Sequence, residues 1–401
     1  MNWRHFIPFF DTTALDWAAT PRLLRWLTFV WLFVGLAVMY SASFPVGDAS
    51  GDGLYYFKRQ LIAIAIGMIC FNILVHVPLR YIQGVSGLGF ISLLGGILLT
   101  TLIGREVNGG QRWFEVGSFL IQPSELIKPF LVLQSARIFG QWERLTWRVR
   151  LTWVGLFCLM LIGILLQPNL STTALCGMTL WLVALAAGLP YIYLGGTAAG
   201  GLILAGLSIS IREYQRRRVM SFLNPWADPL QDGYQLIQSL LAVGSGGVTG
   251  TGFGSSQQKL FYLPIQYTDF IFAVFAEEFG LIGCLFFMVM LVTYATLAVI
   301  VARQAKNAIH RLVAIGVMVI MVGQSLLNIG VATGALPTTG LPLPLFSYGG
   351  SSMVSSLVCA ALLIRVARES SEASVTKIAE NSKVVSFGEA RSRRSKPRPS
   401  R

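Results

Sequence analysis

The sequence has 401 residues, of which 54% are hydrophobic and only 12% are charged, and its formal net charge is +13. Soluble domains carry roughly 25% charged residues, so this composition excludes an ordinary soluble protein. A helix needs about 20 apolar residues to cross a hydrocarbon core. The composition therefore predicts an all-α polytopic membrane protein.

About ten apolar runs follow one another, which predicts ten transmembrane helices. They lie near residues 22–44, 60–78, 83–104, 119–139, 151–167, 170–188, 190–211, 269–302, 311–335 and 345–366. The first is too long for the apolar part of a signal peptide, so we expect a true span. The Lys and Arg residues of the short loops place both termini in the cytoplasm.

These runs divide the chain into three parts. We expect a cytoplasmic N-terminal segment over residues 1–21 and one membrane domain over residues 22–368. The tail over residues 369–401 is polar and basic, and its composition predicts a disordered cytoplasmic segment. Such a tail either anchors the topology or contacts anionic lipids.

Charged residues enter the fourth span from the outer side. The segment "GREVNGGQRWFEVGSFLIQPSELIKP" supplies Arg112, then Glu125 and Lys128 within the span. Because Glu125 and Lys128 are three residues apart, they share a helix face and can pair. A neutralised buried pair and a functional site both fit, since ionisable residues inside a membrane are costly.

A long outer loop of some 57 residues connects the seventh and eighth spans. Loops of this length are usually functional or disordered. The spacing in "DPLQDGYQLIQSLLAVG" predicts a re-entrant or interfacial helix with Leu236, Leu240 and Leu241 on one face. The glycine-rich stretch "GSGGVTGTGFGSSQQK", which ends at Lys259, lacks the spacing of a P-loop. Its glycines are expected to allow tight turns and close backbone approach.

The same loop carries Arg216, Arg217 and Arg218 on the outer side, against the positive-inside trend. Long loops escape that trend, which is one explanation. The other is an anion site, because arginine binds phosphate with two hydrogen bonds.

The stretch "YTDFIFAVFAEEFG" places three carboxylates at and inside the eighth span. Asp269 lies at the mouth of this span, where it can act as a base or cap the helix. Glu277 and Glu278 lie two turns deeper. We expect these glutamates to be neutralised or hydrogen-bonded within the bundle.

The last outer connection, "GALPTTGLPLPLFSYGGSSM", contains three prolines that prevent a continuous helix. Ser347 and Ser351 then open the tenth span. Hydroxyls and free amides at a helix start favour anions.

Six motifs in this order resemble the SEDS family of bacterial cell-wall polymerases (FtsW, RodA and SpoVE), from Leu23 to about Arg368. They are "YSAS", "FKRQ", "NGGQRWFEVGSFLIQPSELIK", "SFLNPWADPLQDGYQLIQSLLAVGSGG", "YLPIQYTDFIFAVFAEEFG" and "PTTGLPLPLFSYGGSS". The stretches "NPWADP", "QQKLFYLP" and "AEE" are more similar to the FtsW-type division branch than to the RodA-type elongation branch.

The resemblance implies a peptidoglycan glycosyltransferase that polymerises lipid II on the outer face of the bacterial cytoplasmic membrane, at the division septum. The catalytic aspartate of the family corresponds to Asp269. Where the family motif has glutamate and histidine, this chain has Ile265 and Tyr267, and it has Asn169 where aspartate is common. Taken together with the charged and hydroxyl residues described above, the resemblance implies a substrate site. Its candidate residues are Arg112, Glu125, Lys128, Arg216, Arg217, Arg218, Lys259, Ser347 and Ser351.

The expected partners are lipid II, membrane lipids, a class B penicillin-binding protein transpeptidase and other division-site proteins, with no nucleic acid. No cofactor is certain, and whether a divalent cation (Mg²⁺ or Mn²⁺) assists the diphosphate stays open. Three alternatives also stay open: a lipid II flippase, an elongation polymerase of the RodA type, and a non-catalytic scaffold. Charged groups inside a bundle also suit transport.

Overall fold

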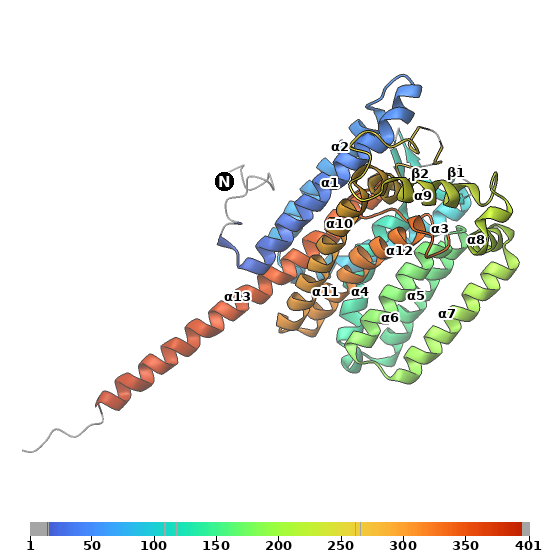
Figure 1. Cartoon of the computed structure of the whole chain (residues 1–401). Coiled ribbons are helices and arrows are strands. Elements are labelled where there is room, and N and C mark those ends of the chain that lie inside the picture. Colours follow the sequence, from blue (N-terminus) through green and yellow to red (C-terminus); the bar gives the residue numbers. More distant parts are fainter. Residues whose placement is uncertain are drawn as a thin grey trace, which may run out of the picture.

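The computed structural model describes residues 14, 16–107, 110–117, 119–260, 262–264 and 266–394. Long helices run beside one another in a bundle, and a small sheet and short helices lie at one end (Figure 1). Helix α13 projects from the opposite end (Figure 1).

Nine helical segments of the described ranges are long and apolar enough to cross a membrane. They are α1 (Ala19–Ala49), α2 (Tyr55–His76), α3 (Leu79–Ile103), α5 (Trp147–Leu166), α6 (Leu170–Ala187), α7 (Tyr191–Ile211), α10 (Ile271–Gln304), the helix Ala308–Ala332, and the Gly350–Glu372 part of α13 (Gly350–Arg394). Ala308–Ala332 comprises α11 (Ala308–Met318), the π-helical turn η6 (Val319–Gly323) and α12 (Gln324–Ala332).

The remaining expected run, the fourth (residues 119–139), forms α4 (Pro123–Gly140), which is followed by the short helix η4 (Trp142–Arg144). Helix α4 is less apolar than the others because it carries Glu125, Lys128 and Arg137. It packs against α3, α6, α11 and α13, and most of its side chains are buried. A polar helix is tolerated here because protein, rather than lipid, surrounds it.

A three-stranded antiparallel sheet, which the sequence analysis did not predict, connects α3 to α4. Its strands β1 (Arg105–Val107), β2 (Gly110–Val116) and β3 (Phe119–Ile121) pair in chain order. Gly117 has a φ of 60° in the turn between β2 and β3, which suits a residue without a side chain. The pairing sets Phe114 opposite Ile121.

The long loop between α7 and α10 contains α8 (Glu213–Leu223), the short helix η5 (Pro225–Ala227) and α9 (Tyr234–Ser245). Helix α9 lies where the spacing predicted a helix. The predicted apolar face of α9 was wrong for Leu241, which is 47% exposed, whereas Leu236 and Ala242 are buried. Positions 236 and 241 differ by about 140° around a helix, so they face different sides.

The glycine-rich segment that follows α9 binds to a break in α10. Gly280 has φ 61° and ψ −163° inside that helix. The amides of Thr251 and Gly252 donate to the carbonyls of Glu277 and Glu278, at 2.9 and 3.1 Å. A Cβ on Gly250 would clash with the Glu278 carbonyl oxygen. The glycines thus allow the backbone of this segment to approach the backbone of α10 closely.

Helix α13 continues from the bundle to Arg394 (Figure 1). The disorder expected from residue 369 onward stays a prediction. No proline occurs between Pro344 and Pro397, so nothing in this stretch forces the helix to end. Residues 395–401, and residues 1–13 of the N-terminal segment, lie outside the described residues.

Candidate active site

A cavity of about 1220 Å³ lies where four helices begin. The residues that precede or start α4, α6, α10 and α13 line it: Gln122, Asn169, Phe270 and Gly349. Helix N-termini carry unpaired amides and the positive end of the helix dipole. The cavity is therefore suited to a negatively charged ligand.

Asp269 faces this cavity from a short segment pinned by backbone contacts. Asn328 Nδ2 donates to the carbonyls of Asp269 and Leu341, both at 2.8 Å. The hydroxyl of Ser347 donates to the carbonyl of Thr268. Phe270 is the N-cap of α10, with no side-chain capping bond, so the carboxylate of Asp269 is not used as the cap.

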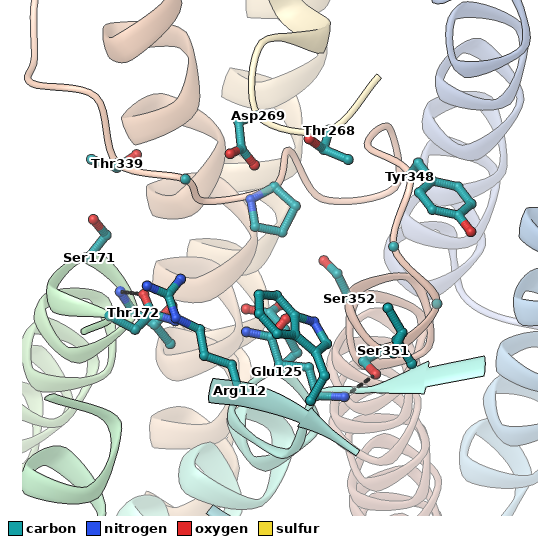
Figure 2. Close-up of a pocket in the computed structure, with 18 of the residues that line it drawn as sticks. Arg112, Glu125, Ser171, Thr172, Thr268, Asp269, Thr339, Tyr348, Ser351 and Ser352 are labelled. Carbon is teal, nitrogen blue, oxygen red and sulfur yellow. Dashed lines mark hydrogen bonds between the residues drawn. The ribbon is translucent and has the colours of Figure 1, made fainter. Parts of the chain in front are cut away.

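Two arginines share the cavity with Asp269. Arg112 donates from Nε to the carbonyl of Gln167 at 2.7 Å and from Nη2 to that of Pro168 at 2.6 Å. Arg218 donates from Nη1 to the carbonyl of Thr338 at 3.1 Å. Figure 2 shows Arg112 and Asp269 on opposite sides of the open space.

Gly340 lies between the side chains of Asp269 and Arg218. A Cβ added to Gly340 would lie 3.5 Å from Asp269 Oδ2 and 3.9 Å from Arg218 Nη1. The carboxylate and the guanidinium therefore flank one glycine. Its φ of 71° favours a residue without a side chain.

Burial and charge act in opposite directions on Asp269. Burial raises the pKa of its carboxyl above the ordinary value, and the Arg218 and Arg112 guanidiniums lower that pKa. Burial also lowers the pKa of Arg112. A raised pKa makes the ionised carboxylate a better proton acceptor than an exposed aspartate.

The Glu125–Lys128 pair forms as the spacing predicted. Lys128 Nζ lies 2.7 Å from Glu125 Oε1 and 2.9 Å from Gln324 Oε1. Glu125 lines the cavity, whereas Lys128 lies behind it and is only 1% exposed. Lys128 thus neutralises Glu125 and is not placed to contact a ligand.

Of the other predicted site residues, some line the cavity and others do not. Ser351 lines the cavity, and its hydroxyl accepts from the Gln122 amide at 2.9 Å. Arg216 and Arg217 are exposed outside the cavity. Lys259 is buried, 2.9 Å from Glu278 and 2.8 Å from the Ser41 hydroxyl, and Ser347 is buried behind the cavity wall. Charge alone did not predict these orientations.

The two deeper glutamates have bundle partners, as expected. The Ser256 hydroxyl and the Gln257 amide donate to the carboxylate of Glu277. Glu278 pairs with Lys259, and both glutamates are 1% exposed. They hold the glycine-rich segment against α10.

Sequence reasoning missed an aromatic side of the cavity, formed by Tyr55, Tyr56, Tyr267 and Tyr348. The "YYFKRQ" run and the tyrosine at the histidine position of the family motif were the available signals. It also missed the structural role of Asn169, whose Oδ1 accepts from the Thr172 amide at 3.2 Å and caps α6. Ile265 lies outside the described residues.

The described residues contain no group of three or more His, Cys, Asp or Glu side chains that could hold a metal ion. In the cavity, the carboxylate of Glu125 is already paired with Lys128. The described residues thus form no all-protein cage for a metal ion, whereas Mg²⁺ is commonly held by one or two carboxylates together with the phosphates of a substrate.

Comparison with known proteins decides the family. The sequence model of FtsW, RodA and SpoVE, described as "Cell cycle protein", matches residues 21–372. This chain belongs to the FtsW/RodA/SpoVE family.

Two relatives in this family carry the name FtsW. A Synechocystis protein named "Probable peptidoglycan glycosyltransferase FtsW" is 58% identical over 93% of this chain and 95% of the relative. A Coxiella burnetii protein with the same name is 36% identical over 84% of this chain and 93% of the relative.

Solved structures show the same fold. A chain from a peptidoglycan synthase complex that coordinates polymerization and crosslinking has a TM-score of 0.68 and 27% identity, over 86% of this chain and 97% of that one. RodA from Thermus thermophilus has a TM-score of 0.65 and 27% identity, over 88% and 98%. The membrane fold and the FtsW-like character predicted from the motifs are confirmed.

Proposed function

We propose that this protein is a peptidoglycan glycosyltransferase that polymerises lipid II, with Asp269 as the base. One observation supports it above all others: a half-buried carboxylate and two arginines face a cavity where four helices begin. Glycosyl transfer from a diphosphate donor needs a proton acceptor and positive charge for the leaving group.

The chemistry can be followed atom by atom. The acceptor hydroxyl gives its proton to the Asp269 carboxylate, and its oxygen forms a bond to the anomeric carbon of the donor sugar. The bond between that carbon and the diphosphate oxygen breaks, and the electron pair leaves with the lipid diphosphate. Arg112, Arg218 and the helix N-termini stabilise the departing negative charge.

The substrate class also explains the apolar part of the cavity. Ile62 and Ile66 of α2 line it and are 46% and 51% exposed. A polyprenyl chain would leave the cavity over these side chains into the membrane. A Mg²⁺ or Mn²⁺ ion, where one takes part, would arrive with the diphosphate.

The relatives guide the cellular assignment. They are named FtsW, and one structural neighbour belongs to a complex that couples polymerization to crosslinking. We therefore propose that the chain acts on the outer face of the bacterial cytoplasmic membrane at the division septum. Its proposed partner is a class B penicillin-binding protein transpeptidase.

The assay that separates an enzyme from a flippase uses detergent, where no second compartment exists. Purified protein, with and without the transpeptidase, receives labelled lipid II, and the products are separated by size. Glycan strands are expected. Their absence, together with lipid II translocation by the same protein in liposomes, would favour the flippase. Absence of both activities would favour the scaffold.

A further inference from the structure

Four tyrosines from three separate segments meet on one side of the cavity. The rings of Tyr56 and Tyr267 lie 4.7 Å apart between centroids, and Tyr348 lies 5.2 Å from Tyr56 and 5.7 Å from Tyr267. Tyr55 contacts Tyr56 at 5.2 Å. These four side chains, here called the tyrosine wall, all line the cavity.

The tyrosine wall is held in place by hydrogen bonds behind it. The Tyr348 amide donates to the carbonyl of Tyr267 at 2.9 Å. Gln60 Nε2 donates to the carbonyl of Ser347, and the Gly349 amide donates to Gln60 Oε1, both at 3.2 Å. The guanidinium of Arg59 lies over the ring of Tyr55, 4.6 Å from its centroid. Rings fixed in this way lose little freedom when a ligand stacks on them.

The wall differs from an aromatic belt at a membrane surface because its rings line an internal cavity. Tyr56, Tyr267 and Tyr348 are each partly exposed there, so ring area is available to a ligand. Tyrosine combines an apolar face with a hydroxyl. A pyranose ring, with C–H groups on its faces and hydroxyls around its edge, matches this combination.

We propose that the tyrosine wall is the binding site for the acceptor sugar, an inference that rests on the proposed function. In the view of Figure 2, Asp269 lies between Tyr348 on one side and Arg112, Ser171 and Thr339 on the other. The attacking hydroxyl and the leaving diphosphate lie on opposite sides of the anomeric carbon in a direct displacement. With the diphosphate beside Arg112, the acceptor sugar lies beside the tyrosines and Asp269 receives its proton.

Tyr267 is the residue to change, because it belongs to the wall and lies two positions from Asp269. Tyr267→Phe keeps the ring, whereas Tyr267→Ala removes it. Tyr262→Ala is a matched control: it removes a tyrosine of the same segment that is 56% exposed and lies outside the cavity lining. Unfolding temperature and elution volume show whether each variant is folded.

The first readout is kinetic. A labelled lipid-linked glycan oligomer serves as donor, and lipid II is varied as acceptor. Tyr267→Ala should raise the acceptor KM roughly tenfold, the effect of losing one aromatic contact, with a smaller change in kcat. Tyr267→Phe, which keeps the ring, should raise the acceptor KM less than Tyr267→Ala does, and Tyr262→Ala should stay within about twofold of wild type. An unchanged KM in a folded Tyr267→Ala variant would overturn the inference while leaving the polymerase function intact.

The second readout is independent of activity. The probe is the disaccharide-peptide without lipid or diphosphate, observed by saturation-transfer NMR with the detergent-solubilised protein. Transfer to the pyranose protons should occur with wild type and Arg112→Gln and be lost with Tyr267→Ala. Equal transfer with Tyr267→Ala, or loss only with Arg112→Gln, would contradict the wall as the sugar site. Should wild type bind the probe without polymerising lipid II, the proposed function fails and the sugar site stands.

Discussion

Asp269 owes its chemical character to its neighbours. Its backbone is fixed by Asn328, and its side chain lies near Arg218 across Gly340. Burial favours the protonated form, and the arginines favour the carboxylate. The balance between burial and the arginines therefore controls the pH range in which Asp269 can accept a proton.

Replacing Arg218 by glutamine should move the acidic limb of the pH–activity profile to higher pH. The guanidinium lowers the pKa of Asp269, so its loss lets burial raise that pKa further. Activity of a carboxylate base falls as pH falls through its pKa, and a higher pKa starts this fall at a higher pH. The profile of kcat/KM against pH measures the shift.

Arg216→Gln is the control for that experiment, because Arg216 is exposed outside the cavity. Its profile should coincide with that of the wild type. An acidic limb that stays in place in Arg218→Gln, or moves to lower pH, would show that Arg218 does not set the pKa of Asp269.

A methyl group at Gly340 should block the site. The new Cβ would contact both Asp269 Oδ2 and Arg218 Nη1 and fill the space between them. Gly51→Ala is the matched control, since Gly51 also has a positive φ, 91°, but has open space around it. Both changes should destabilise by about 1–2 kcal/mol, whereas only Gly340→Ala should lose activity. Equal activity losses would assign the effect to backbone strain.

At the level of single residues, the sequence indicated which charged residues belong to the site region better than it indicated which of their side chains face the cavity. The motifs pointed to Asp269, Arg112, Arg218, Glu125 and Ser351, and all five line the cavity. Arg216 and Arg217 neighbour Arg218 in the sequence but lie on other faces of α8, because successive helical residues are rotated by about 100° around the helix axis. The partner of Lys259 is Glu278 in α10, a tertiary contact that local spacing does not encode.

Among the elements, the broken helix α10 depends on the glycine-rich segment. The break at Gly280 interrupts the backbone hydrogen bonds of a helix that crosses the membrane. Such groups must find partners within the protein. The amides and carbonyls of residues 247–252 supply them, and Lys259 pairs with Glu278 nearby.

Lys259→Met should destabilise the protein by about 3–5 kcal/mol, because Glu278 would keep a buried charge without its cation. The double variant Lys259→Met/Glu278→Gln should recover most of this loss. Lys58→Met is the matched control, since its pair with Asp52 has the same 2.9 Å separation but is exposed, and this change should cost far less. Chemical unfolding in detergent provides the comparison. Similar losses for Lys259→Met and Lys58→Met would contradict a buried structural ion pair.

The apolar runs predicted most of the long helices, because membrane-spanning helices require length and hydrophobicity that are visible in the sequence. The small sheet was missed, since its strands are only three to seven residues long. Short strands depend on pairing with distant residues rather than on local propensity. The break in α10 was also missed because Gly280 lies within a long apolar run.

For the molecule as a whole, one end of the bundle carries the chemistry. The starts of α4, α6, α10 and α13 meet there with β2, β3 and α8 at the cavity. Residues from Tyr55 to Val354 line it, so the site exists only when the whole bundle is assembled. The proposed lipid-linked substrate would require this end to face the outer side of the membrane.

Membrane orientation can be tested with single cysteines. Asp232→Cys, in the exposed segment between α8 and α9, should react with a membrane-impermeant maleimide on intact cells. Lys306→Cys, between α10 and α11, should react only after permeabilisation. The native cysteines lie within predicted spans, and wild type measures their background. Reaction of Lys306→Cys in intact cells, with protection of Asp232→Cys, would reverse the proposed orientation.

The most direct test of the account is glycan polymerisation from labelled lipid II by Asp269→Asn beside the wild type, both in detergent with the transpeptidase partner. Asparagine keeps nearly the same shape but cannot accept the proton, so the rate should fall at least about a hundredfold. Retained sugar-probe binding and an unchanged unfolding temperature would show that the variant is intact. Polymerisation by Asp269→Asn at the wild-type rate would contradict Asp269 as the base.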